Sequence, residues 1–187
     1  MLETKRLILR RWEDSDAESL FEYAADPDVG PIAGWPAHQS MAESLLVIRT
    51  VLNKPETYAV CLKTDAKAIG AISLKLNGDT DMTEQDDECE MGYWIGKPFW
   101  GQGLIPEAAR EILRHAFEDL GMAKVFCGYY EGNEKSRRVQ EKIGLRYQWT
   151  TEDVDVPLMH ETRTGHVSAI TRQQWIEDRI HREGEEK

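Results

Sequence analysis

The most informative stretch of the chain is Gly92-Tyr-Trp-Ile-Gly-Lys-Pro-Phe-Trp-Gly-Gln-Gly-Leu-Ile-Pro-Glu107. It begins as an apolar strand, turns through Gly101 and Gly103, and continues with apolar residues at helical spacing as far as Leu120. The start of a helix carries free backbone N–H groups and the positive end of the helix dipole, and it therefore binds anions. Glycine has no Cβ, so a phosphate can approach the backbone closely at this turn. The segment predicts a strand, an anion-binding loop and a long helix.

A second motif follows that helix. After a strand that is expected to end at Tyr130, the sequence reads Asn133-Glu-Lys-Ser136-Arg-Arg-Val-Gln-Glu-Lys142-Ile-Gly144-Leu. A short G-x-G is a weak signal alone, since a plain loop is its commoner role. The two motifs in this order resemble the GCN5-related N-acetyltransferase (GNAT) superfamily. Within it, the chain most resembles the Rim-type ribosomal-protein N-acetyltransferase subfamily.

The resemblance covers nearly the whole chain. Residues 4–10 are similar to the subfamily's first strand, residues 90–95 to its strand before the phosphate loop, and residues 162–163 and 169–175 to its C-terminal ending. It implies a single N-acetyltransferase domain over residues 1–187. The implied fold class is α/β, an α+β mixed sheet that is splayed at its centre and flanked by helices.

The hydrophobic pattern predicts the order of the elements without the resemblance. Strands are expected at residues 6–12, 57–62, 68–76, 90–95, 122–130, 145–150 and 166–170, and helices at 17–24, 40–52, 105–120, 133–143 and 172–182. Residues 26–39 form a loop rich in proline and glycine, and residues 77–88 form an acidic connection. The charged tail, residues 183–187, is expected to be disordered.

Composition restricts the classes of partner. The net charge of −11 over 187 residues argues against a nucleic-acid partner. No apolar run approaches the roughly 20 residues that a membrane span needs, so no membrane partner is expected. Cys61, Cys89 and Cys127 lack metal-ligand and redox spacing. They predict buried free thiols in a reducing compartment, and therefore a cytoplasmic protein.

The resemblance implies acetyl-CoA as the cosubstrate and assigns its contacts. The peptide-like pantetheine arm would pair with the backbone of Trp94 and Ile95, where the strand splays from its neighbour. Asn133 is similar to the family's pantetheine-contacting Asn. The pyrophosphate would lie on the loop formed by Trp100, Gly101, Gln102, Gly103, Leu104 and Ile105.

The cofactor is an anion, and the negative charge of the chain opposes its binding. Candidate cations that would offset this charge lie beside the second motif, at Arg137, Arg138 and Lys142. A solvated helix face is an equally good interpretation of these three residues. Two further positions depart from the family, because Ile105 is bulkier than usual and Pro106 has no N–H to donate. Proline is nonetheless favoured in the first turn of a helix.

Acetyl transfer by direct attack needs a base for the ammonium proton and a donor for the departing thiolate. Many family members use a Tyr as the donor, but Gln140 stands at that position here. Rim-type enzymes instead have a Ser, so Ser136 is the candidate donor, and a capping role for it is compatible. Glu90 is the candidate base, directly or through water, beside the alternative of an exposed strand Glu. The reserve candidates for the base are Tyr130, His38 and His160.

The first long loop offers candidates for the acceptor site. Trp35 and His38 are of the kind that line a substrate pocket on this fold, although Trp35 is equally suited to plug the core. The acidic stretch from Asp79 to Glu88 lacks the Gly and the ligand rhythm of an EF-hand, so no metal is predicted. Family analogy leaves open a homodimer through the C-terminal strands.

Two functions remain open on the sequence. The first is an acetyl-CoA-dependent N-acetyltransferase acting on a primary amine, either a protein N-terminus or a small amine. The second is a non-catalytic CoA-binding or regulatory module of the same fold, because Ile105, Pro106 and Gln140 depart from the family. A Rossmann-type dinucleotide site does not fit, since no G-x-G-x-x-G follows the strand.

Overall fold

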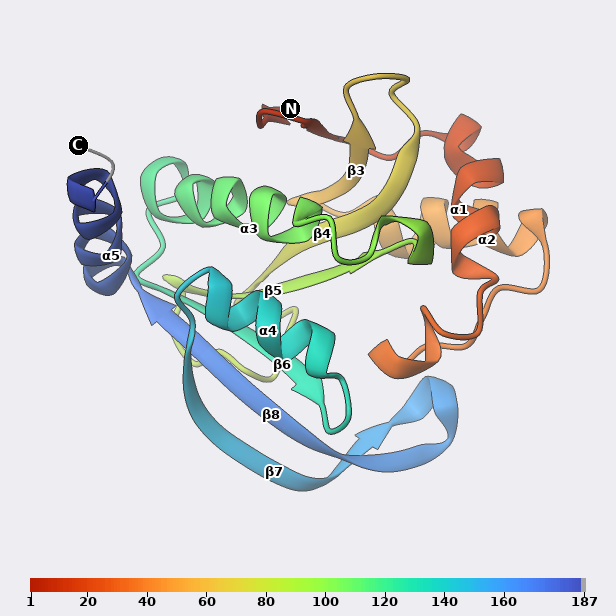
Figure 1. Ribbon diagram of the computed structural model, residues 1–187. Helices are drawn as coiled ribbons and strands as arrows, with labels where there is room; N and C mark the ends of the chain where they lie inside the picture. Colours follow the sequence, from red (N-terminus) through yellow and green to blue (C-terminus); the bar gives the residue numbers. More distant parts are fainter. Residues whose placement is uncertain (186–187) are drawn as a thin grey trace.

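The fold is built on one mixed sheet. The computed structural model describes residues 1–185, in which eight strands have the order β1-β2-β3-β4-β5-β6-β8-β7 (Figure 1). The strands are β1 Leu2–Glu3, β2 Leu7–Arg10, β3 Thr57–Leu62, β4 Ala68–Leu76, β5 Glu88–Ile95, β6 Lys124–Tyr130, β7 Arg146–Val156 and β8 Glu161–Thr171. Neighbours pair antiparallel except β5 and β6, which are parallel and joined by a crossover through a helix.

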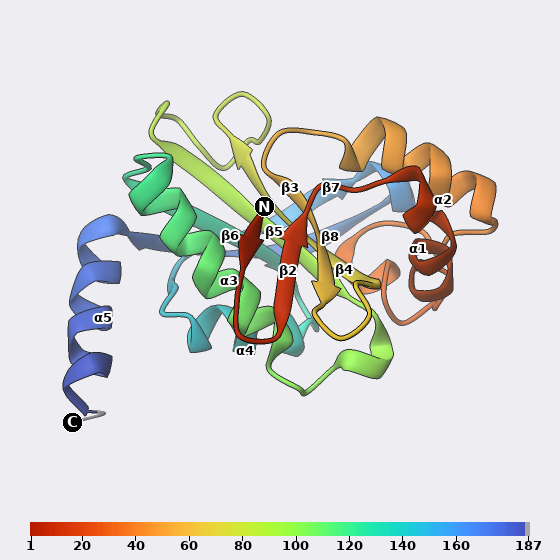
Figure 2. The same cartoon turned by 90° about the horizontal axis from the view of Figure 1, so that it is seen from above.

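Helices cover both faces of the sheet (Figure 2). The α-helices are α1 Ala17–Ala24, α2 Met41–Val47, α3 Leu104–Arg114, α4 Glu134–Lys142 and α5 Arg172–Glu185. Wider π-helical turns extend α2 through Ile48–Leu52 and α3 through His115–Asp119. Short 3-10 turns occur at Asp14–Asp16, Pro31–Ala33, Lys97–Phe99 and Pro157–Met159. No helix within residues 1–185 combines the length and the apolarity needed to cross a membrane.

Alternation along the central strands divides the core into two parts. Val60 and Ile72 face the cluster under α3, whereas Ala59 and Ala71 face the cluster under α1 and α2. These side chains are at most 5% exposed. Burying one large aliphatic side chain stabilises the fold by about 1.5–3 kcal/mol. Because both faces of the central strands are covered, their sequences are continuous apolar runs and do not alternate with polar residues.

The sheet opens between β5 and β6. The two strands pair only through Glu88, Cys89 and Glu90, which lie opposite Lys124, Val125 and Phe126. From Met91 to Ile95, β5 pairs with β4 alone, while β6 pairs with β8 along its whole length. The splayed sheet expected from the sequence is thus present, and it leaves one backbone edge of β5 without a strand partner in the described part of the chain.

The largest differences from the expected elements lie at the C-terminal end. Strand β7 continues to Val156, and β8 begins at Glu161, so the two form a long, curved hairpin at one edge of the sheet, at the bottom of the view in Figure 1. Helix α5 runs to Glu185, past its expected end. Residues 186–187 of the expected disordered tail lie outside the described residues. Strands β3 and β4 have the predicted bounds.

Candidate active site

The loop between β5 and α3 has the backbone geometry of an anion site. Gly101 and Gly103 have φ values of +74° and +72°, in the left-handed region that favours glycine, and Gly103 is the N-cap of α3. The first intrahelical hydrogen bond runs from Glu107 N to Gly103 O, at 3.2 Å. The N–H groups of Leu104 and Ile105 precede that bond and have no partner among residues 1–185. These donors are available to an anion at the helix start.

The bulky residue in this loop does not obstruct it. Ile105 is 4% exposed and packs in the hydrophobic core, so its side chain points away from the solvent-facing side of the loop. Trp100 donates from its indole Nε1 to Ile95 O at 2.9 Å, and the Lys135 ammonium lies 4.0 Å from its ring centroid. The Gln102 side chain donates instead to Pro98 O at 2.9 Å. This hydrogen bond turns the Gln102 side chain toward Pro98, and Gln102 does not line the pocket described below.

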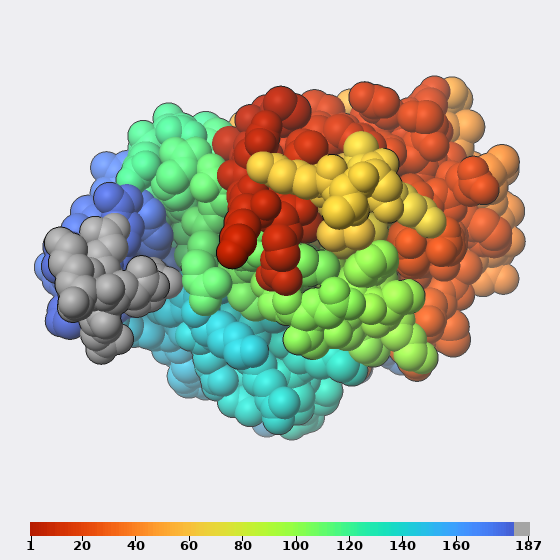
Figure 3. Space-filling view, turned by 45° about the horizontal axis from the view of Figure 1, so that its top comes forward, coloured from red at the N-terminus to blue at the C-terminus, as the bar shows by residue number. Residues whose placement is uncertain are grey.

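The N-terminal segment holds the loop in place. Arg6 donates from Nη1 to Gln102 O at 3.0 Å and from Nε to Glu107 at 2.6 Å, while Thr4 donates to Glu107 at 2.6 Å. In Figure 3 the red N-terminal surface lies against the green surface that contains this loop. Burial tends to raise the pKa of Glu107, but the hydrogen bonds from Thr4 and Arg6 outweigh it and hold that pKa below its ordinary value.

A pocket of about 960 Å³ lies between this loop and the start of α4. It is lined by all of the expected cofactor residues except Gln102, namely Trp94, Ile95, Trp100, Gly101, Gly103, Leu104, Ile105, Asn133 and Ser136. Tyr93 belongs to the same wall, and the unpaired edge of β5 runs along it. A peptide-like chain can add to such an edge through main-chain hydrogen bonds. We refer to this space as the cofactor pocket.

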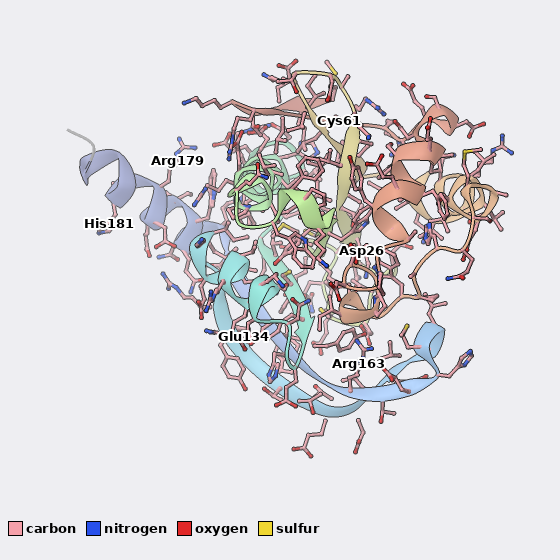
Figure 4. The ribbon with its side chains drawn as sticks, turned by 45° about the vertical axis from the view of Figure 1, so that its right-hand side comes forward. Asp26, Cys61, Glu134, Arg163, Arg179 and His181 are labelled. Carbon is pink, nitrogen blue, oxygen red and sulfur yellow. The ribbon has the colours of Figure 1, made fainter. Side chains whose placement is uncertain are left out.

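The cations of the cofactor pocket differ in part from those expected. Arg138 and Lys142 line it, but Arg137 does not, because it pairs with Glu134 and Glu141 on the outer side of α4. Lys135 and Arg163 line it as well. Both were present in the quoted motifs without an assigned role, and their sequence position did not show which way they face. Figure 4 labels Arg163 and Glu134, which come from β8 and α4.

The second motif places two polar side chains with different tasks. Asn133 is the N-cap of α4, since its Oδ1 accepts from Ser136 N at 3.2 Å. The Ser136 hydroxyl is therefore not the capping group. It lies 3.0 Å from the Tyr93 hydroxyl and 3.4 Å from Gln140 Nε2. The hydroxyl of Ser136 is thus positioned by β5 and by its own helix.

Glu90 lies at the point where β5 and β6 separate. It is 8% exposed, and its Oε1 accepts from Lys75 Nζ at 2.9 Å. Its Oε2 accepts from the Thr80 hydroxyl in a short hydrogen bond. The alternative of an exposed strand Glu does not hold, because the carboxylate is buried against these two partners. Neither Lys75 nor Thr80 had a sequence signal, since both come from segments outside the motifs.

A second pocket, of about 1050 Å³, contains Glu90 together with both expected acceptor residues, Trp35 and His38. The rings of Trp35 and Trp94 are 5.7 Å apart, so Trp35 packs against the core and lines the pocket at once. His38 Nδ1 lies 2.8 Å from Ser44 Oγ. Burial lowers the pKa of His38, and Glu43 offsets this only in part. We refer to this space as the acceptor pocket.

The reserve candidates for the base differ in where they lie relative to the acceptor pocket. Tyr130 lines the acceptor pocket, and the guanidinium of Arg163 lies 5.2 Å from its ring centroid. His160 lies at the turn between β7 and β8, with a φ of +54°, and lines neither pocket. His160 is therefore not placed to accept a proton from a group held in the acceptor pocket.

The two pockets meet at the opening of the sheet. Tyr93, Trp94, Asn133 and Ser136 line both of them. Glu90 and Trp94 point to the acceptor side and Tyr93 to the opposite face, as alternation along a strand requires. Two molecules entering from opposite faces of the sheet would therefore touch at this junction.

The cysteines supply no reactive thiol, although Cys127 lines the acceptor pocket and interacts with Tyr93. Cys61, Cys89 and Cys127 are buried and free, as predicted. Burial raises the pKa of Cys61 to about 11 and those of Cys89 and Cys127 to about 12. Such thiols are inert near neutral pH. Within the described residues there is no cluster of three or more His, Cys, Asp or Glu side chains arranged to hold a metal ion.

Comparisons with known proteins agree with this architecture. The chain is 37% identical over 89 residues to YdaF of Bacillus subtilis (strain 168), whose name assigns it provisionally as a ribosomal N-acetyltransferase. That match covers 48% of this chain and 46% of YdaF, so the chain spans about half the length of this curated relative. A GNAT-family acetyltransferase from Bacillus anthracis superposes with a TM-score of 0.80, at 21% identity, covering 92% of this chain and 98% of that one.

A further solved structure is the microcin C7 self-immunity acetyltransferase MccE in complex with acetyl-CoA and AMP. It superposes with a TM-score of 0.71 at 17% identity, covering 89% of this chain and 93% of that one. The family model described as "Acetyltransferase (GNAT) domain" matches residues 6–146, which is more than half of the chain. The matched range includes both motifs and strand β5, which lines both pockets. The chain belongs to the GNAT acetyltransferase family.

Proposed function

We propose that this chain is an acetyl-CoA-dependent N-acetyltransferase that acetylates a primary amine by direct attack. The observation that carries the proposal is the junction of the cofactor pocket and the acceptor pocket at Tyr93, Trp94, Asn133 and Ser136. A transferase must bring two substrates together while holding each on its own surface. A module that only binds CoA has no need of a second pocket that opens on the same point.

Acetyl-CoA fits the cofactor pocket group by group. The pyrophosphate would accept hydrogen bonds from the N–H groups of Leu104 and Ile105, next to the cations Arg138 and Lys142. The pantetheine amides would pair with the free edge of β5 at Trp94 and Ile95. This path leads the thioester to the junction. The co-crystallised acetyl-CoA of MccE, a protein of the same fold, supports this choice of cofactor.

The chemistry needs a balanced transfer of one proton and one electron pair. The amine nitrogen attacks the thioester carbonyl carbon, a C–N bond forms, and the C–S bond breaks with its electron pair leaving on sulfur. Glu90 would take the proton of the attacking amine, directly or through a water molecule. Ser136 would donate a hydrogen bond to the thiolate. The proton that Glu90 has received then passes through solvent to the thiolate, which gives CoA and restores the carboxylate. The products are the acetamide and CoA.

The acceptor pocket favours a protonated amine with an apolar body. Its charged lining residues are Glu43, Lys75, Asp81, Glu90 and Asp155, so carboxylates outnumber the single ammonium group. Such a surface concentrates cations at low ionic strength. Trp35, Trp94 and Tyr130 supply aromatic walls. Both a peptide N-terminus and a small amine satisfy this description. The naming of YdaF supports the first class, and a homodimer and a cytoplasmic location stay predictions.

Calorimetry with acetyl-CoA, followed by an acetylation screen, tests the proposal. The screen would contain N-terminal peptides and a panel of small amines, with release of the CoA thiol as the readout. We expect acetyl-CoA binding and turnover of at least one cationic amine. Binding of acetyl-CoA without turnover of any amine would favour the non-catalytic module. Failure to bind acetyl-CoA at all would contradict both functions.

A further inference from the structure

Two polar side chains, those of Tyr93 and Gln140, lie next to the oxygen of Ser136 at the junction of the pockets. The Tyr93 hydroxyl is 3.0 Å from Ser136 Oγ and 3.1 Å from the Ser136 carbonyl oxygen. Gln140 Nε2 is 3.4 Å from Ser136 Oγ and 3.3 Å from Gly128 O. Tyr93 is on β5, whereas Gln140 is one helical turn after Ser136 on α4. The hydroxyl of Ser136 is therefore fixed from two elements.

The orientation of the Gln140 amide follows from its neighbours. A carbonyl oxygen needs a donor opposite it, so Gly128 O requires the NH₂ end of the amide on its side. The same NH₂ group then faces Ser136 Oγ as a donor. Gln140 is 1% exposed, and its Oε1 has no hydrogen-bond partner among the described residues. An unpaired buried oxygen costs free energy, so packing alone does not account for an amide at this position.

Tyr93 keeps the proton that it needs in order to act as a donor. Burial raises its pKa well above the ordinary value of 10.0, so the phenol keeps its proton near neutral pH. A serine hydroxyl has one proton and two lone pairs. When Tyr93 and Gln140 both donate to Ser136 Oγ, the lone pairs are occupied and the Ser136 proton must point to a third group. The remaining direction is the junction of the two pockets, which Ser136 lines.

We propose that Tyr93 and Gln140 are positioning residues, which direct the Ser136 proton onto the departing sulfur by donating to the Ser136 oxygen. This inference rests on the proposed function, because it takes Ser136 as the thiolate donor. Before the reaction, the Tyr93 proton can instead lie on the Ser136 carbonyl oxygen. As negative charge develops on sulfur, the Ser136 proton turns to the sulfur and the Tyr93 proton turns to Ser136 Oγ. No covalent bond is formed or broken by Tyr93 or Gln140.

The test measures the pKa of the CoA thiol in its complex with the full chain, from the ultraviolet absorbance of the thiolate. This readout needs no knowledge of the acceptor. In the wild type the donated hydrogen bond should lower the thiol pKa below that of free CoA. Tyr93→Phe should raise it again by about half to one unit, the equivalent of one net hydrogen bond. Gln140→Met should act in the same direction. Tyr147→Phe, an exposed tyrosine on β7, is the matched control.

A double-mutant cycle separates positioning from structure. On a Ser136→Ala background, Tyr93→Phe should cause no further change in the thiol pKa, because the group that it positions is gone. With an amine substrate in hand, Tyr93→Phe should lower kcat about three- to tenfold and leave the KM for acetyl-CoA unchanged.

The outcomes distinguish the inference from the proposed function. A chain that does not bind CoA, or whose Ser136→Ala variant keeps the wild-type thiol pKa, contradicts the role of Ser136 and with it the inference. The inference is overturned, and the role of Ser136 is kept, if Ser136→Ala raises the thiol pKa but Tyr93→Phe shifts that pKa equally with and without Ser136. If Tyr93→Phe does not fold, Gln140→Met carries the same cycle with the same expectations.

Discussion

The ammonium of Lys75 lies 2.9 Å from Oε1 of Glu90, and the two residues face each other across the β4–β5 ladder. The pair is asymmetric, because the Lys75 side chain is 48% exposed and that of Glu90 only 11%. Lys75 thus holds the carboxylate against the wall of the acceptor pocket. Lys75 and Thr80 do not use all the lone pairs of the Glu90 carboxylate. Glu90 can accept a proton on the lone pairs that remain.

Replacement of this carboxylate tests the candidate base. Glu90→Gln keeps the shape and one acceptor oxygen, which can face Lys75, while the amide NH₂ can donate to the Thr80 oxygen. It removes the basic site, so turnover should fall by roughly 10²–10⁴. The loss should persist at low pH and be partly recovered at high pH, where the amine arrives neutral. The pH–rate profile measures both effects. Glu84→Gln, in the exposed loop before β5, serves as the control. An unaltered profile in Glu90→Gln would assign the base elsewhere, with Tyr130 and His38 next to test.

Asn133 and Ser136, at the start of α4, should differ in what their replacement changes: stability for Asn133 and turnover for Ser136. Asn133→Ala removes the group that caps Ser136 N and should destabilise the chain by about 1 kcal/mol. Ser136→Ala removes no cap, so its main effect should be a fall in turnover of about 10²–10³ with little change in affinity for acetyl-CoA. Chemical denaturation and steady-state kinetics on both variants measure the split. A Ser136→Ala variant that loses only stability would exclude the thiolate-donor role.

The phosphate loop can be tested through its backbone. Gly103→Val forces a β-branched residue to a φ of +72°, which costs about 1–2 kcal/mol in conformational energy. The loop should rearrange, and calorimetry should show loss of acetyl-CoA binding in a folded protein. Gly78→Val is the matched control, because Gly78 has a φ of +93° and lies in a turn away from both pockets. Equal affinity for acetyl-CoA in the two variants would remove the loop from the binding site.

The contact between the N-terminus and α3 should appear in the pH dependence of stability. The pKa of Glu107 is lowered in the folded state, so its contribution is present above the ordinary value of 4.5 and is lost as the pH falls through the folded-state pKa. Glu107→Gln should therefore be less stable than the wild type near pH 7, and this difference should vanish toward acid pH. Thermal unfolding from neutral to acid pH measures it. A difference that is independent of pH would exclude the charge of Glu107 as its cause.

Local signals in the sequence were sufficient for the main elements and for most of the residues that line the pocket beside the glycine loop, whose binding of acetyl-CoA stays a prediction. Strands β3 and β4 have the predicted bounds, and the glycines of the loop adopt the left-handed conformation that only a residue without Cβ adopts readily. Hydrophobic periodicity and glycine placement are properties of neighbouring residues, so they can be read directly. The length of the β7–β8 hairpin could not, because its exposed residues lack the alternation that marks a half-buried strand.

Contacts between residues that are distant in the sequence could not be predicted, because they depend on the tertiary structure. Glu90 and Ser136 were chosen from motifs, but Lys75 beside Glu90 and Tyr93 beside Ser136 come from other strands and faces. Arg137 and Arg138 are adjacent in sequence, yet one pairs with glutamates on the outside of α4 and the other lines the cofactor pocket. A helix turns each successive side chain by about 100°, so neighbours in sequence face different surroundings. Residue types and their spacing therefore define the family, while the partners of each functional group depend on how the sheet opens and on which face of each helix meets it.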